Sequence, residues 1–265
     1  DPHRRPDRRL FGAACGDESR SSDTSASGGS GAEKSTITIV TYSSYVLDEK
    51  VQAKVEADLG VRIEVKATGD AAEALSGAIL TAGRPEGDIF FGVDNTLLSR
   101  AVAGEAFERP ASAPANLSTI PDRLRLDESG VLFPVDVGPV CVDYDAQWFE
   151  EHELDPPTSF EDLAAPEYRD LLVAESPVTS SPGLVFLMAI HEQFGDGAAD
   201  YLQRLVDNGM SIAGSWDDAW GAQYTVSGGD RPLVVSYASS PPAEVFYSEG
   251  AVETPRTKVI DATCA

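Results

Sequence analysis

The feature that most constrains the fold is a regular alternation of strand-like and helix-like segments over residues 36–103. Residues 36–42 read TITIVTY, a β-branched and apolar run that predicts a buried strand. Residues 47–59 carry an apolar side chain at every fourth position before Gly60, which is typical of an amphipathic helix. The alternation continues with predicted strands at 61–67 and 88–93 and predicted helices at 71–82 and 95–103. Such a succession indicates a parallel α/β sheet.

A second alternating region follows a long segment that contains Pro134, Gly138 and Pro139. We expect residues 131–144 to be extended and to pass from one lobe to another. Beyond it we predict strands at 171–174, 211–213 and 233–237, helices at 160–163, 183–194, 198–208 and 217–226, and a loop at 238–242. The length of 265 residues allows one or two domains or lobes.

The balance of charge excludes some classes of partner. The chain has 20 Lys and Arg residues against 44 Asp and Glu residues, which gives a formal net charge of -24. Nucleic acid and anionic membrane surfaces require a basic footprint, so we expect neither as the main partner. The longest apolar run, residues 184–190, is much shorter than the ~20 residues that span a bilayer, so we expect no membrane-spanning helix.

Residues 1–34 are expected to form a leader and tether. Basic residues in 4–9 and small residues before Cys15 resemble a bacterial lipoprotein signal around its lipidated cysteine. Only residues 10–14 supply an apolar region, where such a signal needs ~7–15 apolar residues, so a plain flexible leader is the alternative. Residues 15–33 are rich in Ser, Gly, Asp and Ala, a composition that favours disorder.

The other two cysteines, Cys141 and Cys264, lie in strand-like runs and outside any CxxC or Cys/His cluster. Zinc and redox motifs are therefore unsupported. In an exported protein the two residues would pair, with their Cα atoms ~4.4–6.8 Å apart. Two buried free thiols are the alternative.

Ser180 and Ser181 precede the predicted apolar helix at 183–194. Hydroxyls and free N–H groups at a helix N-terminus suit an anion such as phosphate. An ordinary N-cap with proline in the first turn explains the same residues.

Trp216, Trp220 and Tyr224 are four residues apart, beside Asp217 and Asp218. Four-residue spacing places the aromatic rings on one helix face. Aromatic faces beside carboxylates suit a flat, cationic ligand. An aromatic stripe that packs into the core is the alternative.

Polar residues follow several predicted strands. Tyr42 ends the first, Asp94 and Asn95 follow the strand at 88–93, and Tyr237 ends the strand at 233–237. In open α/β sheets, ligands bind beyond the carboxyl ends of the strands, so these residues favour a binding cleft. Ordinary turn residues have a similar composition.

Catalytic patterns are absent from the sequence. The three histidines, His3, His152 and His191, lie respectively in the leader, in an acidic run and on an apolar helix. No nucleophile elbow, zinc-protease motif, dinucleotide fingerprint or P-loop is present. We therefore expect a protein that is not an enzyme.

Several runs together resemble the thiamine-binding solute receptors of bacterial ABC importers. They are TYSSY, DIFFGVDNTLLSRA, PVDVGPVCVDYD, SFEDLAAPEY, SSPGLVFL, SWDDAWG and LVVSYASSPPAE, in family order over residues 36–265. The last three distinguish this group from the broader class, which includes ferric-ion receptors that generally use two adjacent tyrosines. Tyr237 stands between Ser236 and Ala238, so we expect no such metal site.

The resemblance implies a type II-like periplasmic-binding-protein fold, in which two α/β lobes close on the ligand by hinge bending. The ligand contacts that it implies are Tyr42, Asp70, Ser180, Ser181, Trp216, Trp220 and Tyr237, with Asp94 and Asn95 as further candidates. Aromatic rings would stack on the ligand, an acidic side chain would serve its charged or amino-bearing part, and hydroxyls would hold a phosphate tail. The pattern of the predicted helix at 71–82 also makes Asp70 its N-cap.

The resemblance also implies an organisation along the chain. We expect a leader at 1–34, one lobe at 35–138, a second lobe at 139–235, and at 236–265 a return crossover that begins an incomplete C-terminal part. The family normally continues past Cys264, which implies that this chain is truncated there.

The function implied is that of an extracytoplasmic, non-enzymatic receptor, lipid-anchored through Cys15, that captures thiamine or its phosphates and delivers them to an ABC permease. No cofactor is expected, and the protein is expected to be a monomer. A receptor for another cationic solute or for ferric ion is the alternative. A transferase on the same scaffold is a further alternative, with Cys141 as the only candidate nucleophile.

Overall fold

The computed structural model describes residues 34–265, so the predicted leader and its Cys15 lie outside the described residues. The first part of the fold is a three-stranded parallel sheet with the order β2-β1-β3. Its elements are β1 (Thr36–Thr41), α1 (Glu49–Leu59), β2 (Arg62–Ala67), α2 (Ala71–Leu80), β3 (Ile89–Phe90) and α3 (Leu98–Ala103). The parallel α/β arrangement predicted for this region is confirmed.

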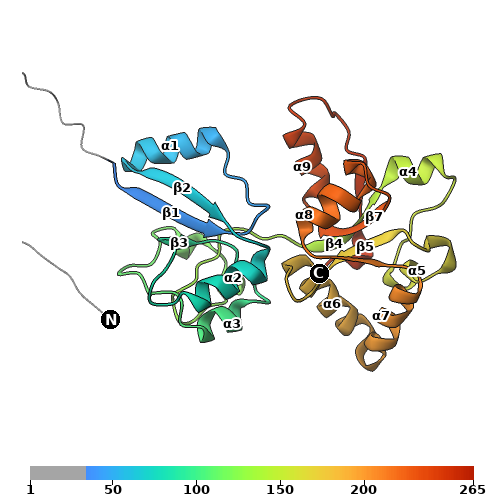
Figure 1. The fold of residues 1–265 in the computed structure, drawn as a ribbon, viewed down its shortest axis with the longest axis horizontal. Coiled ribbons are helices and arrows are strands. Elements are labelled where there is room, and N and C mark those ends of the chain that lie inside the picture. Colours follow the sequence, from blue (N-terminus) through green and yellow to red (C-terminus); the bar gives the residue numbers. More distant parts are fainter. Residues whose placement is uncertain (1–33) are drawn as a thin grey trace, which may run out of the picture. The chain divides into compact units, whose positions relative to one another are not determined.

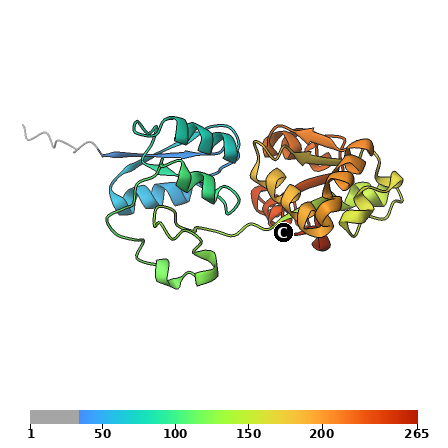
Figure 2. The ribbon, with the colours of Figure 1, turned by 90° about the horizontal axis from the view of Figure 1, so that it is seen from below.

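The helices of the first part cover both faces of its sheet. Helix α1 lies on one face and helix α2 lies on the other (Figure 1, Figure 2), and α3 packs with α2. Leu75 of α2 and Ala101 of α3 pack into one buried cluster, against which Phe90 of β3 rests. Asp48 caps α1 through hydrogen bonds from the backbone N–H groups of Lys50 and Val51.

The second part is built on a five-stranded sheet with the order β6-β5-β7-β4-β8. Strand β5 is parallel to β6 and β7, whereas β4 is antiparallel to β7 and β8. Its elements are β4 (Val140–Asp145), α4 (Ala146–Glu151), α5 (Phe160–Leu163), β5 (Leu172–Glu175), α6 (Ser181–Phe194), α7 (Ala198–Asp207), β6 (Ser211–Ala213), α8 (Trp216–Asp218), β7 (Leu233–Tyr237), α9 (Ser240–Tyr247) and β8 (Thr257–Ile260). A π-helical turn, Ala219–Gln223, follows α8 directly.

Each face of the second sheet carries its own buried cluster. Val142, Leu172 and Val235 face a large cluster that includes Ile190 of α6 and Leu205 of α7. The opposite face holds Val173 and Val234, which pack against Ala219 and Tyr224 in and after the π-helical turn. The alternation of side chains along a strand explains how neighbouring residues of β5 and β7 serve different clusters.

Of the extended segment predicted at 131–144, only the part from Val140 onward forms a strand, β4. Val135 and Val137 are 75% and 65% exposed, and residues 131–139 pair with none of the described strands. Proline has no N–H group for a sheet ladder, so Pro134 and Pro139 oppose pairing. Residues 105–139 instead form loops with two short 3₁₀ turns, Leu117–Thr119 and Asp122–Leu124 (Figure 2).

The predicted crossover at 236–265 also differs from the structure. Residues 240–247, expected in part as loop, form helix α9, and β8 pairs with β4 in the five-stranded sheet. Two prolines occupy the first turn of α9, where a missing N–H group costs no helical hydrogen bond. Hydrogen bonds join Val140 and Ala265 in both directions, so residues 236–265 stay with the second sheet.

Cys141 and Cys264 form a disulfide, with Cα atoms 4.1 Å apart, slightly less than the predicted range. Cys141 lies in β4 and is buried, and Cys264 follows the 3₁₀ turn Asp261–Thr263. Within residues 34–265, no helix has the length and apolar character required to cross a membrane.

Candidate functional site

Tyr42 and Asp70 lie at the carboxyl ends of two neighbouring strands. Tyr42 follows β1, and Asp70 is the N-cap of α2, three residues beyond β2. The two strands are parallel, so their carboxyl ends meet at one edge of the sheet, and the N–H of Ser43 donates to the carbonyl of Gly69 at 2.7 Å. Asp70 is buried and caps α2, as the helical pattern predicted, and Glu73 completes a capping box with it.

Hydrogen bonds connect this edge to residues of the second sheet's part. The backbone N–H of Trp216 donates to Oδ2 of Asp70 at 3.0 Å, across 146 positions of sequence. The hydroxyl of Ser43 donates to Oδ2 of Asp217 at 2.6 Å, and the N–H of Ala72 donates to the carbonyl of Thr179 at 3.1 Å. Asp70 and Trp216, both predicted as ligand contacts, therefore touch each other.

The aromatic residues at 216–224 form a stack. The ring centroids of Trp216 and Trp220 are 5.4 Å apart at an interplanar angle of 11°, and those of Trp220 and Tyr224 are 4.9 Å apart at 41°. Tyr224 is fully buried, and Trp220 packs against the same core cluster. The core interpretation thus applies to these two residues, whereas Trp216 is half-buried at the end of the stack.

A single continuous helix at 217–226 was predicted, but the structure has one turn of α-helix followed by the π-helical turn. The wider turn still brings side chains four residues apart into contact, and it leaves Trp220 between its two aromatic neighbours. Such π-helical turns occur frequently at functional sites.

Trp216 is also held through its indole nitrogen. Nε1 donates to Oγ of Ser236 at 2.9 Å, and that hydroxyl lies 2.9 Å from Oγ of Ser240. Both serines are buried, so the indole ring is fixed by a hydrogen bond shielded from water. Ser236 and Ser240 were not predicted to support Trp216, because their link to it depends on how the second sheet folds.

Tyr237 lies in a negatively charged setting. Burial is the main cause that raises its pKa, and the neighbouring acidic groups Tyr42, Asp70, Asp94 and Glu175 raise it further. The pKa of Tyr42 is raised to about 12, again by burial and then by Asp136, Tyr45 and Asp70. Both phenols therefore stay protonated at neutral pH and can donate hydrogen bonds.

Ser180 and Ser181 lie at the N-terminus of α6, as predicted. The two residues are only 1% and 8% exposed, and neither hydroxyl has a hydrogen-bond partner among residues 34–265. Ser180 is the N-cap residue by position, but its side chain makes no capping hydrogen bond. The ordinary N-cap interpretation therefore does not account for these hydroxyls, whereas a polar ligand would satisfy them.

Asp94 and Asn95, also predicted as candidate ligand contacts, lie in the turn before α3. Asp94 accepts hydrogen bonds from the N–H groups of Thr96 and Leu97 and from the hydroxyl of Thr96, so it orders the turn before α3. Asn95 is exposed. The structure thus gives Asp94 a local structural role and brings neither residue into hydrogen-bond contact with the predicted site.

Glu175 is a further candidate site residue that was not predicted from the sequence. This residue ends β5 and is 2% exposed, and neither carboxyl oxygen has a hydrogen-bond partner in the described part of the chain. Burial raises its pKa well above the usual range of a glutamate. The available signal was a lone acidic residue directly after the apolar run 171–174, at the end of a predicted strand.

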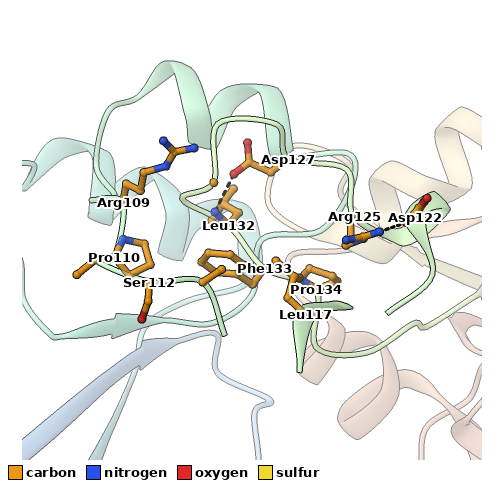
Figure 3. Close-up of a pocket in the computed structure, with 13 residues that line it drawn as sticks. Arg109, Pro110, Ser112, Leu117, Asp122, Arg125, Asp127, Leu132, Phe133 and Pro134 are labelled. Atoms are coloured by element: carbon orange, nitrogen blue, oxygen red, sulfur yellow. Dashed lines mark hydrogen bonds and ion pairs between the residues drawn. The ribbon is translucent and has the colours of Figure 1, made fainter. Parts of the chain in front are cut away.

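A hollow of about 600 Å³ lies elsewhere, among the loops at 109–134 (Figure 3). Asp127 orders one side of it, since its carboxylate accepts hydrogen bonds from the backbone of Ser129, Val131 and Leu132. Burial opposes ionisation of Asp127, but these hydrogen bonds prevail and lower its pKa to about 2. None of the predicted ligand contacts lines this hollow. Within residues 34–265, no cluster of three or more His, Cys, Asp or Glu side chains is placed to hold a metal ion.

Comparisons with known proteins identify relatives of this chain. The family model described as "Bacterial extracellular solute-binding protein" matches residues 86–244. A thiamine-binding periplasmic protein of Brucella suis biovar 1 (strain 1330) is 28% identical over 212 residues, which cover 78% of this chain. The chain spans about 60% of the length of that curated relative.

Solved structures show the same architecture. A periplasmic thiamin binding protein superposes with a TM-score of 0.67 at 22% identity, covering 86% of this chain and 68% of its own. Iron-bound HitA from Pseudomonas aeruginosa superposes with a TM-score of 0.65 at 15% identity, covering 85% of this chain and 69% of its own. At these identities the superpositions establish the fold, and proteins with different ligands share it.

Proposed function

The chain belongs to the bacterial extracellular solute-binding protein family, and from this premise we propose that it captures thiamine outside the cytoplasm and delivers it to an ABC permease. The predicted resemblance to thiamine-binding receptors, the two-lobed α/β fold and the periplasmic or extracellular location are confirmed by the comparisons. Thiamine itself, the permease and a lipid anchor at Cys15 are parts of the proposal.

The observation that carries the proposal is the contact between Asp70 and Trp216. A buried carboxylate there holds the backbone of a half-buried tryptophan, whose ring is stacked on Trp220 and fixed by Ser236. Thiamine has two flat rings and a permanently charged thiazolium. A fixed aromatic face beside a carboxylate suits such a cation, because the ring quadrupole and the negative charge both attract it.

Two further observations favour a binding protein. The transferase alternative requires a reactive cysteine, but Cys141 is bonded to Cys264. The hydroxyls of Ser180 and Ser181 lack hydrogen-bond partners in the part of the chain that the structure describes, which suits a ligand rather than a closed structural turn. We therefore propose that the protein binds its ligand without chemical change.

The proposal is tested by titrating the purified full chain with thiamine while tryptophan fluorescence is recorded. A ligand ring that stacks on Trp216 should change the emission in a saturable way. Ferric citrate, titrated in parallel, represents the metal alternative. Saturation by ferric citrate with no response to thiamine would contradict the proposal.

The choice between thiamine and its phosphates is tested with Ser180→Ala. A hydroxyl at a helix N-terminus donates to an anion, and hydrogen bonds to charged groups are worth roughly 1.5–3 kcal/mol. We expect the affinity for thiamine monophosphate to fall about tenfold or more, and that for thiamine to change little. Calorimetry with both ligands measures the difference. Equal losses for the two ligands would remove Ser180 from phosphate recognition.

A further inference from the structure

Glu175 lies on the same face of the second sheet as Ser236, whose hydroxyl accepts the hydrogen bond from the indole nitrogen of Trp216. Strand β5 lies between β6 and β7, with Val173 opposite Val234 and Glu175 opposite Ala213. Two residues beyond Val173, Glu175 lies level with Ser236, which is two residues beyond Val234. Because side chains alternate along a strand, Glu175 faces the same side as Val173, where Trp220 packs.

No described residue satisfies the Glu175 carboxyl group. It forms no ion pair within residues 34–265, and both oxygens lack hydrogen-bond partners although the residue is 2% exposed. Burying an unpaired polar group costs free energy, so such a group in a native protein requires an explanation. A ligand that supplies a partner is one.

The charged and titratable groups that face Glu175 are negative or neutral. Asp70 at the N-terminus of α2 and Tyr237 of β7 are electrostatically coupled to it. Strand β6 and the π-helical turn contain no titratable side chain, and Asp217 and Asp218 of α8 are exposed.

Helix α6 also packs against β5, and its N-terminus approaches closely. A Cβ atom added at Gly183 would lie 2.4 Å from the Glu175 carbonyl oxygen. The titratable residues of α6, His191 and Glu192, are about two turns or more farther along the helix. None of these neighbouring groups supplies a positive charge beside the Glu175 carboxyl group, so a cationic ligand would complement it.

We propose that Glu175 contacts the ligand and loses its proton when a cationic ligand binds. This inference rests on the proposed function and assigns Glu175 as a residue that determines charge specificity. The O–H bond of the carboxyl group breaks, the proton passes to the solvent buffer, and the carboxylate faces the ligand's positive charge.

The sign of the pH dependence follows from linkage. Burial, and the charge of Asp70, raise the pKa of Glu175 in the free protein well above the usual range of a glutamate, which favours its neutral form. A bound cation lowers that pKa, because it favours the carboxylate. Between the two pKa values binding releases a proton, so affinity increases with pH, by up to about tenfold per pH unit.

The experiment is calorimetric titration of the full chain with thiamine in two buffers of different ionisation enthalpy, from pH 6 to 8. The difference in heat between buffers gives the number of protons released, which we expect to approach one per thiamine. Glu175→Gln keeps the shape and removes the titrating group, so proton release and pH dependence should disappear. Asp143→Asn is the matched control, since Asp143 is likewise buried, its carboxyl oxygens have no hydrogen-bond partner among residues 34–265, and burial raises its pKa to about 8.

Three results would overturn the inference. They are equal heats in the two buffers with the wild-type chain, unchanged proton release in Glu175→Gln, and loss of proton release in Asp143→Asn alone. The comparison of the two buffers with the wild-type chain tests proton release even where a variant folds poorly. Absence of any thiamine binding contradicts the proposed function itself, whereas binding without proton release contradicts only the role of Glu175.

Discussion

Replacement of Trp216 by alanine should weaken thiamine binding about 30–1000-fold. Truncation of a buried aromatic anchor typically costs roughly 2–4 kcal/mol of binding free energy. In this protein the indole is fixed on three sides, by Trp220 against its ring, by Ser236 at Nε1 and by Asp70 at the backbone. A preorganised ring loses little conformational freedom on binding, so its contact energy appears largely as affinity.

Calorimetry on the wild type and on two variants measures this effect. Trp216→Phe keeps an aromatic face but loses the hydrogen bond to Ser236, so its affinity should lie between those of the wild type and Trp216→Ala. Trp148→Ala is the matched control, because Trp148 of α4 stacks on His152, which follows the helix, with ring centroids 3.8 Å apart, and Trp148 packs against a different cluster. Unchanged affinity in Trp216→Ala would remove the stacking argument and the main reason to prefer thiamine.

The sequence predicted those parts of the fold that local chemistry determines. The β-branched run before Tyr42 forms β1, and the pattern around Asp70 predicted both α2 and its cap. Residues 233–237 form β7 with the predicted bounds. In each case side-chain shape or a local hydrogen bond selects one backbone conformation.

Elements that depend on tertiary packing were less predictable. The first turn of α9 contains Pro241 and Pro242, which typically indicate a loop, yet the helix forms against β8. The π-helical turn after α8 has no distinct sequence pattern, because its extra width is selected by packing of Trp220 and Tyr224 on the sheet.

The candidate site divides in the same way. Aromatic and hydroxyl residues at strand and helix ends were recognisable, because their chemistry suits a ligand and their positions follow from the α/β pattern. Glu175 and Ser236 were not recognised, because their roles depend on tertiary neighbours. Glu175 lacks a hydrogen-bond partner among the described residues, and Ser236 accepts a hydrogen bond from Trp216. An unpaired buried carboxyl group is a property of the surrounding residues, which sequence spacing alone does not reveal.

Reduction of the Cys141–Cys264 disulfide should lower the free energy of unfolding by ~4–5 kcal/mol. The two cysteines are 123 positions apart, and a cross-link of that length removes much conformational entropy from the unfolded chain. Domains of ordinary stability have only about 5–15 kcal/mol in total, so the reduced protein should be close to unfolding at 37 °C.

The position of the bond strengthens this expectation. The disulfide joins β4, which lies between β7 and β8 in the sheet, to the residues that follow β8. Without it, β8 and the residues beside it would be held by the pairing of β8 with β4 and by backbone hydrogen bonds between Val140 and Ala265. Side-chain interactions that involve Thr263, Glu244 and the Arg256–Asp145 ion pair would also remain. We therefore expect β8 to separate from the sheet first when the bond is reduced.

Urea unfolding with and without reductant measures the loss, in a Cys15→Ser background so that only this pair can respond. Cys141→Ala/Cys264→Ala is the matched variant, and it should show the lower stability in both conditions. Hydrogen exchange should show the earliest loss of protection at Thr257–Ile260. Two titratable thiols in the non-reduced Cys15→Ser protein, or equal unfolding midpoints with and without reductant, would contradict the prediction. Because this covalent link holds the residues after β8 to β4, we expect the oxidised protein to retain the pairing of β4 with β8 at urea concentrations at which the reduced protein loses it.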